Sequence, residues 1–449
     1  MPATRPAMIP TCRMRSLPVL TLLAAVPFAA ANEPVRLVEK ATPGSEFRVV
    51  TQSTISGELL TPVAKDKPPE RIRISGNSSI DYSERVLPVD AKDADFKSLR
   101  VYEKIDFEKK AGDRTDNMTL RPAVRRLVFM KKGPHKVPFS PDGPLLWGEI
   151  DLLRTDIVVP ALGGLLPDKA VKVGDSWKAT PAAVTELTDL EKVEKGELVC
   201  KLDRVIAVGP RKVAEVSFDG TLTGINEDGP TRQQLSGRFQ VDLVAECISF
   251  LKVTGEHFLL DADGKDAGHV SGTFEMTRIP APGHPGLTEA VVKSLDLNPS
   301  PENTKLLYHS PETAVRFIHP RNWRVVRSTG RQITLDETDG AGLLITLDAA
   351  DGAPTAARYL REAVKELEER GGKILDSKPP ERLAEGLERF LLDVQLGKEK
   401  VTMAYFVIRQ EKGAATLAGR VPEPFREVRL KELDGLARSF VVTRRLDGK

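Results

Sequence analysis

The sequence predicts an α+β protein of two domains that differ in hydrophobic periodicity. Between residues 32 and 279, apolar and polar residues alternate with a period of two, which is typical of half-buried antiparallel strands. Between residues 306 and 445, similar short strands are joined by segments with helical spacing. A proline-rich stretch, residues 280–305, separates the two patterns and predicts a stiff linker.

The composition excludes several broad classes. A chain of 449 residues is too long for one ordinary core, and 40% hydrophobic with 29% charged residues indicates a globular protein. The 66 Lys and Arg nearly balance the 64 Asp and Glu, so no long-range field draws the protein to nucleic acid. We therefore expect no nucleic-acid partner.

Residues 1–31 have the pattern of a cleaved signal peptide. Arg13 and Arg15 precede a mostly apolar run from Leu17 to Phe28, and small alanines follow it. The run is too short to span a bilayer, and no second long apolar run follows, so we expect no transmembrane segment in the mature chain. The sequence thus predicts an exported protein, periplasmic or extracellular.

Export leaves two cysteines, because Cys12 lies in the signal peptide. Cys200 and Cys247 are compatible with one disulfide in an oxidising compartment. They are equally compatible with two buried free thiols on separate strands, and spacing alone does not decide between these alternatives.

The first domain, residues 32–279, is expected to be an antiparallel twisted sheet or half-barrel. Its predicted strands cover residues 47–53, 71–75, 101–107, 125–131, 214–218, 239–243 and 270–276. Turns are predicted at Asp219-Gly220, Asp228-Gly229 and Asp263-Gly264. Short helices are predicted at 145–154 and 181–193, where apolar residues recur at helical spacing.

A loop between these two helices carries a recurrent motif. Residues 165–177 read LLPDKAVKVGDSW and end on an apolar Trp177. This run resembles a motif of uncharacterised exported bacterial β-rich proteins, which implies no known activity. The surrounding β pattern is similar in architecture to the half-barrels of periplasmic lipid carriers, and a shared fold does not define a function.

The second domain, residues 306–445, combines strands with two helices. Predicted strands cover residues 316–318, 323–327, 332–336, 343–347, 373–377, 387–395, 401–409 and 414–418. A helix is predicted from Thr355, its N-cap, to Arg370, where Gly371-Gly372 ends it. A closing helix carries Leu433, Leu436 and Phe440 on one stripe.

The start of this domain, FIHPRNWRVV, resembles the PsbP-like fold family. Pro320 and Trp323 match the family's YP-x-x-W mark, whereas His319 occupies a position where an aromatic residue is commoner. The resemblance covers roughly 140 residues and implies an α/β/α sandwich. It also implies a binding or assembly factor, because these families are mostly non-enzymatic.

No motif for catalysis or cofactor binding is present in the sequence. The six histidines have no i, i+3 or i, i+4 pair, and neither a G-x-S-x-G elbow nor a phosphate-binding glycine loop occurs. The acids at 261, 263 and 266 lack the glycine and glutamate spacing of a calcium loop. We therefore predict no catalytic residue, metal or cofactor.

The three tryptophans admit two interpretations. Trp147, Trp177 and Trp323 could stack on a sugar, but each lies in a local apolar pattern, which favours core packing. We accordingly assign structural roles to Trp177, Pro320 and Trp323.

Three functional hypotheses remain. The first is a non-enzymatic binding or assembly protein of the cell envelope, taking a hydrophobic ligand or an envelope protein as partner. The second is a hydrolase with dispersed acids in an interdomain cleft, because carboxylate pairs leave no local sequence mark. The third is a structural envelope component.

Overall fold

The computed structural model describes residues 33–61, 70–90, 92, 94–133, 135–154, 156–226, 229–261 and 263–446. The predicted signal peptide, residues 1–31, lies outside the described residues. Within the described chain, no helix combines the length and the apolar character needed to cross a membrane.

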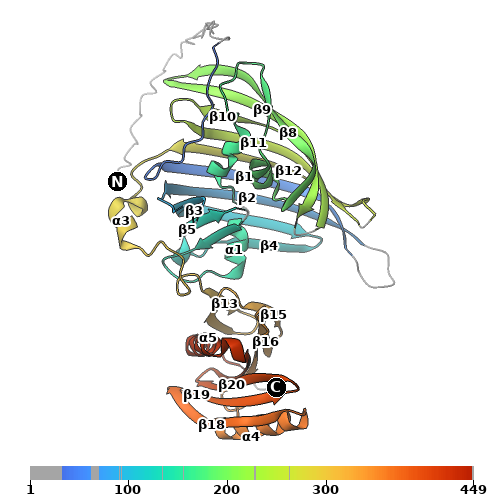
Figure 1. Ribbon diagram of the computed structural model, residues 1–449, viewed down its shortest axis with the longest axis vertical. Coiled ribbons are helices and arrows are strands. Elements are labelled where there is room, and N and C mark those ends of the chain that lie inside the picture. The colour runs from blue at the N-terminus through green and yellow to red at the C-terminus, as the bar shows by residue number, and fades with distance from the viewer. Residues whose placement is uncertain are drawn as a thin grey trace, which may run out of the picture.

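The described residues fold mainly into strands that form three antiparallel sheets (Figure 1). The strands of the first sheet are β1 (Glu46–Thr61), β2 (Glu70–Val86), β3 (Phe96–Ala111), β4 (Arg114–Thr119), β5 (Arg126–Lys132), β6 (His135–Phe139), β7 (Ser176–Lys178), β8 (Lys192–Val208), β9 (Arg211–Asn226), β10 (Gly229–Asp242), β11 (Cys247–Leu260) and β12 (Asp266–Pro280). The later strands are β13 (Leu306–Ser310), β14 (Val315–His319), β15 (Arg324–Ser328), β16 (Gln332–Asp336), β17 (Gly342–Asp348), β18 (Lys373–Ala384), β19 (Leu387–Leu396), β20 (Glu399–Gln410), β21 (Gly413–Pro422) and β22 (Val441–Val442).

The helices are short and few. The α-helices are α1 (Trp147–Arg154), α2 (Pro181–Thr188), α3 (Glu289–Ser294), α4 (Ala356–Glu369) and α5 (Arg426–Ser439). The 3₁₀ turns are η1 (Pro122–Val124), η2 (Val159–Leu165), η3 (Pro285–Leu287) and η4 (Glu423–Phe425).

The first sheet is a single curved layer. In the described residues its strand order is β6-β5-β3-β2-β1-β12-β11-β10-β9-β8-β7, and β4 pairs only with β3. β1 pairs with β12, with Phe47 opposite Pro280 in register. The first and the last strand of this sheet in chain order therefore lie side by side in its middle. Figure 1 shows β8 to β12 bending strongly around one side of the molecule.

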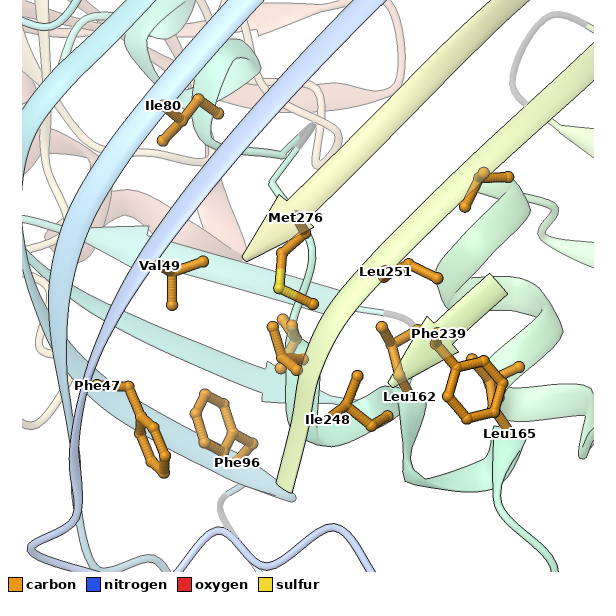
Figure 2. Close-up of a cluster of buried hydrophobic side chains, with 14 of the residues drawn as sticks. Phe47, Val49, Ile80, Phe96, Leu162, Leu165, Phe239, Ile248, Leu251 and Met276 are labelled. Atoms are coloured by element: carbon orange, nitrogen blue, oxygen red, sulfur yellow. The ribbon is translucent and has the colours of Figure 1, made fainter. Parts of the chain in front are cut away.

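The inner face of this sheet carries the main core. Register places Thr51, Met276, Leu251 and Phe239 side by side on neighbouring strands, and all four are buried. The covering segment, residues 145–154 and 156–190, packs onto this face through α1, η2 and α2. Figure 2 shows Leu162 and Leu165 of η2 among side chains of β10 and β11.

Glycines inside the strands permit the curvature. The predicted turn at Asp219-Gly220 is wrong, because both residues lie within β9. A Cβ at Gly220 would come within 2.2 Å of the Glu197 carbonyl oxygen on β8, and one at Gly237 would lie 2.5 Å from the Phe218 ring. Only glycine fits such a close approach between coiled strands. The Asp263-Gly264 turn is confirmed, and Gly264 has a φ of +77°.

The two cysteines are free, which corrects the disulfide alternative. Cys200 on β8 and Cys247 on β11 are both buried thiols. β9 and β10 lie between their strands, so the spacing across the sheet is about 14 Å, at roughly 4.8 Å per strand, whereas a disulfide needs Cα atoms within about 7 Å. Burial raises the pKa of the Cys200 thiol to about 12 and that of Cys247 to about 11.

The outer face of the first sheet is partly covered by the chain that leaves it. Leu287 at the end of η3 and the half-buried Val292 of α3 pack against Leu99 and Val128, which belong to β3 and β5. The proline-rich segment therefore carries two short helical pieces, η3 and α3.

The C-terminal part contains the other two sheets. One has the order β13-β14-β22, and the other has the order β15-β16-β17-β21-β20-β19-β18 within the described residues. α5 packs against β14, β20 and β21, whereas α4 packs against β18 and β19. Thr355 caps α4 by accepting a hydrogen bond from the Arg358 amide, as predicted.

The predicted fold class is wrong. Strands make up 56% and helices 16% of the structure, so the protein is mainly β, not α+β. Among its described residues the C-terminal part shows no α/β/α sandwich, because α4 and α5 are single helices that cover only a few strands each. The physical reason is that β18 to β21 are long antiparallel strands, which stabilise one another by direct pairing without a helical layer.

Candidate functional site

A cleft of about 920 Å³ lies where the first sheet meets the C-terminal strands. Figure 1 shows α1 and β4 on one side of this junction and β13 and β15 on the other. The residues that line the cleft are Asn117, Met118, Thr119, Leu146, Trp147, Gly148, Glu149, Leu152, Leu307, Tyr308, His309, His319, Trp323, Arg324 and Val325. Most of these side chains are apolar or aromatic, which is typical of ligand sites.

Trp147 is the most accessible large apolar side chain of this lining. It is 53% exposed, although its sequence context predicted a buried residue, so that interpretation is wrong for Trp147. The indole is exposed because it occupies the first position of α1, whereas Ile150 and Leu153 turn toward the core. An exposed indole at a cleft offers a large apolar surface to a partner at a small cost in side-chain entropy.

The backbone that carries Trp147 is held firmly. The buried Glu149 carboxylate accepts hydrogen bonds from the Leu146 amide (2.7 Å) and from the Arg121 amide and guanidinium (2.7–3.1 Å). Leu145 forms a bridge to Leu306, in which the Leu307 amide donates to the Leu145 carbonyl at 2.8 Å. The indole is therefore presented from a fixed position next to the C-terminal strands.

The opposite wall is built on an aromatic stack. Phe317 stacks on Tyr308 with ring centroids 4.7 Å apart and on Phe440 at 5.8 Å. The Tyr308 hydroxyl is 2.9 Å from the Ser328 hydroxyl, which connects β13 to β15 across the gap between their two sheets. The wall is consequently preformed.

The residues assigned structural roles are placed as follows. Trp323 is 2% exposed, and its indole N–H donates to Glu432 at 2.8 Å. The Pro320 carbonyl accepts from the Trp323 amide at 3.2 Å. Trp177 is half-buried on β7, away from the cleft lining, and donates to the Leu165 carbonyl at 2.7 Å. Trp177 therefore does not join the other two tryptophans, and no three-tryptophan sugar platform forms.

His319 borders the cleft as a buried ring. It is 5% exposed, and its Nδ1 atom lies 2.9 Å from the Pro320 carbonyl oxygen. Burial lowers the pKa of His319, and the hydrogen bond to Pro320 opposes that shift in part. Near neutral pH the His319 ring is therefore uncharged and forms a partly apolar portion of the cleft wall.

A fully buried charge cluster lies elsewhere, on the inner face of the first sheet. The Arg100 guanidinium binds Glu84 at 2.9 Å and Asp156 of the covering segment at 2.8 Å. It also lies 4.6 Å from the ring centre of Tyr82 and 4.3 Å from that of Phe129. All of these groups are almost completely buried, so the cluster fastens the covering segment to the sheet and is closed to any substrate.

No local pattern in the sequence predicts the cleft. Its lining comes from four segments between residues 117 and 325, which only long-range pairing brings together. A local signal for Trp147 was present, because it lies off the helical stripe of Leu146, Ile150 and Leu153 that the spacing predicts to face the core.

Comparisons with known proteins give no assignment. No protein family and no curated protein matches the chain. The chain has a structural likeness to the cyanobacterial PsbP (CyanoP) of Synechocystis sp. PCC 6803, with 16% identity, 31% of this chain and 92% of that chain covered, and a TM-score of 0.25. MucB of Pseudomonas aeruginosa, solved with MucA, covers 88% of this chain and 93% of its own at 10% identity and a TM-score of 0.15.

A third likeness is to DynF from the dynemicin biosynthesis pathway of Micromonospora chersina, with 11% identity, 60% and 94% coverage, and a TM-score of 0.15. At these TM-scores none of the three carries an argument about fold or function. The PsbP resemblance seen in the sequence is thus matched over part of the chain only, and the motif at residues 165–177 finds no support.

Proposed function

We propose that the protein is an exported, non-enzymatic binding protein of the cell envelope whose partner occupies the cleft around Trp147. The observation that carries this proposal is a preformed cleft of about 920 Å³ with a fixed, half-exposed indole at its mouth. Burying that indole contributes to binding through the apolar area removed from water. Export is supported by the signal-like pattern of residues 1–31.

The lining of the cleft disfavours the hydrolase hypothesis. Glycoside hydrolysis requires two carboxyl groups on either side of the substrate. Glu149 is the one carboxylate among the described lining residues, and both of its oxygens bind the Arg121 guanidinium. A binding role needs no such pair.

The test uses 1-anilinonaphthalene-8-sulfonate as the probe and the mature full-length protein. We expect the probe to bind and to accept excitation energy from the tryptophans. Trp147→Ala should weaken this binding by about tenfold or more, because a buried aromatic anchor is worth at least about 1.4 kcal/mol. Val244→Ser is the matched control, since Val244 is 71% exposed and does not line the cleft.

The proposal would be refuted by equal probe affinity in the Trp147→Ala variant and the unmodified protein. Turnover of a generic ester, glycoside or peptide panel that is lost in a Glu149→Gln variant would refute its non-enzymatic part.

A further inference from the structure

The cleft is bordered by terminal strands of the three sheets described above. β4, β13 and β15 each pair with a single strand in the described structure, β13 also forms the bridge to Leu145, and each contributes residues to the cleft lining. A terminal strand presents one row of backbone N–H and C=O groups that no neighbouring strand satisfies. The cleft therefore combines an apolar anchor with backbone donors and acceptors.

β15 is the most accessible of the three. All five of its residues are exposed, including Val325 (37%) and Val326 (55%), and it pairs only with β16. A bulge between Val325 and Arg327 interrupts that pairing. Val325 also lines the cleft with Trp147, so a chain lying along β15 passes within reach of the indole.

The free edge carries positive charge. Arg324 and Arg327 are exposed on β15, and neither has an ion-pair partner among the described residues. By contrast, the guanidinium on the opposite side of the cleft, Arg121, is already paired with Glu149. The edge therefore has two cations available for a negatively charged partner.

We propose that an extended acidic segment of another envelope protein binds as an added strand along β15. This inference rests on the proposed function and names its partner class. The segment's backbone pairs with the outer edge of β15, in the mode known as β-strand addition. An apolar side chain of the segment packs against Trp147, and neighbouring carboxylates face Arg324 and Arg327.

Charge and chemistry favour this occupant over two others. A second copy of β15 in antiparallel pairing would bring arginines close to arginines, and like charges across strands are destabilising. An acyl chain could cover Trp147, but it would leave the backbone groups of β15 without hydrogen-bond partners. An acidic strand satisfies the apolar, backbone and charged features together.

The experiment selects peptides of about ten residues, the upper range of strand lengths, from a random phage-displayed library on the mature protein. Enriched peptides should combine acidic with apolar residues. Arg324→Glu/Arg327→Glu should weaken their binding about tenfold or more, because two attractions become repulsions. Arg444→Glu/Arg445→Glu is the matched control, since both arginines are exposed and lie away from the cleft lining.

A second readout locates the peptide. Hydrogen exchange followed by mass spectrometry should slow at residues 324–328 when an enriched peptide is bound, and Trp147→Ala should weaken binding. Library enrichment without acidic residues, unchanged affinity in the Arg324→Glu/Arg327→Glu variant, or unchanged exchange at 324–328 would each overturn the proposal. Slower exchange there with vesicles of phosphatidylglycerol and phosphatidylethanolamine alone would assign the edge to a membrane and also overturn it.

The two proposals fail in distinguishable ways. If the naphthalene probe still binds in a Trp147-dependent manner and no peptide is enriched, the binding cleft stands and the strand-addition inference falls. If probe binding is also independent of Trp147, both proposals fall.

Discussion

Replacing Arg100 with methionine tests how the covering segment is fastened to the first sheet. The Arg100 guanidinium is fully buried and binds the carboxylates of Glu84 (2.9 Å) and Asp156 (2.8 Å), which are each 1% exposed. The Tyr102 hydroxyl donates to the same Asp156 oxygen at 3.0 Å. Methionine fills a similar volume but leaves both carboxylates without this cation.

We expect Arg100→Met to lower the free energy of unfolding by about 3–5 kcal/mol, the usual cost of removing one partner of a buried ion pair. The matched control is Arg48→Met. Arg48 binds Asp81 at 2.7 Å, but its side chain is 53% exposed, so its loss should cost only about 0–1 kcal/mol. Because both arginines pair with residues of β2, the comparison of the two variants tests the effect of burying the ion pair.

The assay is urea-induced unfolding followed by far-ultraviolet circular dichroism and tryptophan fluorescence. A third variant, Glu84→Met/Arg100→Met/Asp156→Leu, should recover most of the lost stability, because replacing a whole buried ionic cluster with apolar residues is often neutral or stabilising. If Arg100→Met costs no more than Arg48→Met, the cluster does not fasten the segment and the reasoning is refuted.

Three further predictions concern pH, thiols and glycines. Burial lowers the pKa of His319 in the folded protein, so the contribution of His319 to stability is present above its unfolded-state pKa near 6.5 and is lost as the pH falls below that value. Between about pH 7.5 and about pH 5, the melting temperature of a His319→Phe variant should therefore fall less than that of the unmodified protein. Equal falls in melting temperature would contradict this. Because burial raises the pKa of both thiols, Cys200 and Cys247 should resist alkylation by iodoacetamide at neutral pH until the protein is denatured. Both thiols are free, so the intact mass of the protein should not change on reduction. Labelling of the native protein, or a mass gain on reduction, would disprove this prediction. Gly237→Ala should lower the free energy of unfolding by about 1–3 kcal/mol, because the new methyl group overpacks against the Phe218 ring. Gly435→Ala in α5, where the space around the glycine is open, should raise the free energy of unfolding by about 0.5–1 kcal/mol. Similar effects of both changes on urea unfolding would count against the close-approach argument.

Local chemistry predicted those elements that depend on neighbouring residues. Thr355 caps α4, and Gly371 ends that helix with a φ of +80°. Gly264 makes the turn between β11 and β12 with a φ of +77°. Each of these depends on backbone conformations that a few adjacent residues determine.

Long-range effects explain what the sequence did not reveal. β8 was not predicted, because bulges at Val193/Lys195 and Leu202/Arg204 shift the phase of its alternation. Gly220 was taken for a turn residue, although contact with β8 is what requires a glycine there. The cleft depends on the bridge between Leu145 and Leu306, which no local pattern encodes.

The order of strands in the first sheet also constrains how the protein folds. β1 completes its pairing only when β12 arrives, although almost all of the sheet separates them in the sequence. Such non-local pairing gives a high contact order and slow folding. One side of β1 therefore stays unpaired during synthesis until residue 280 has been made, and an unpaired strand edge of this kind exposes the growing chain to aggregation.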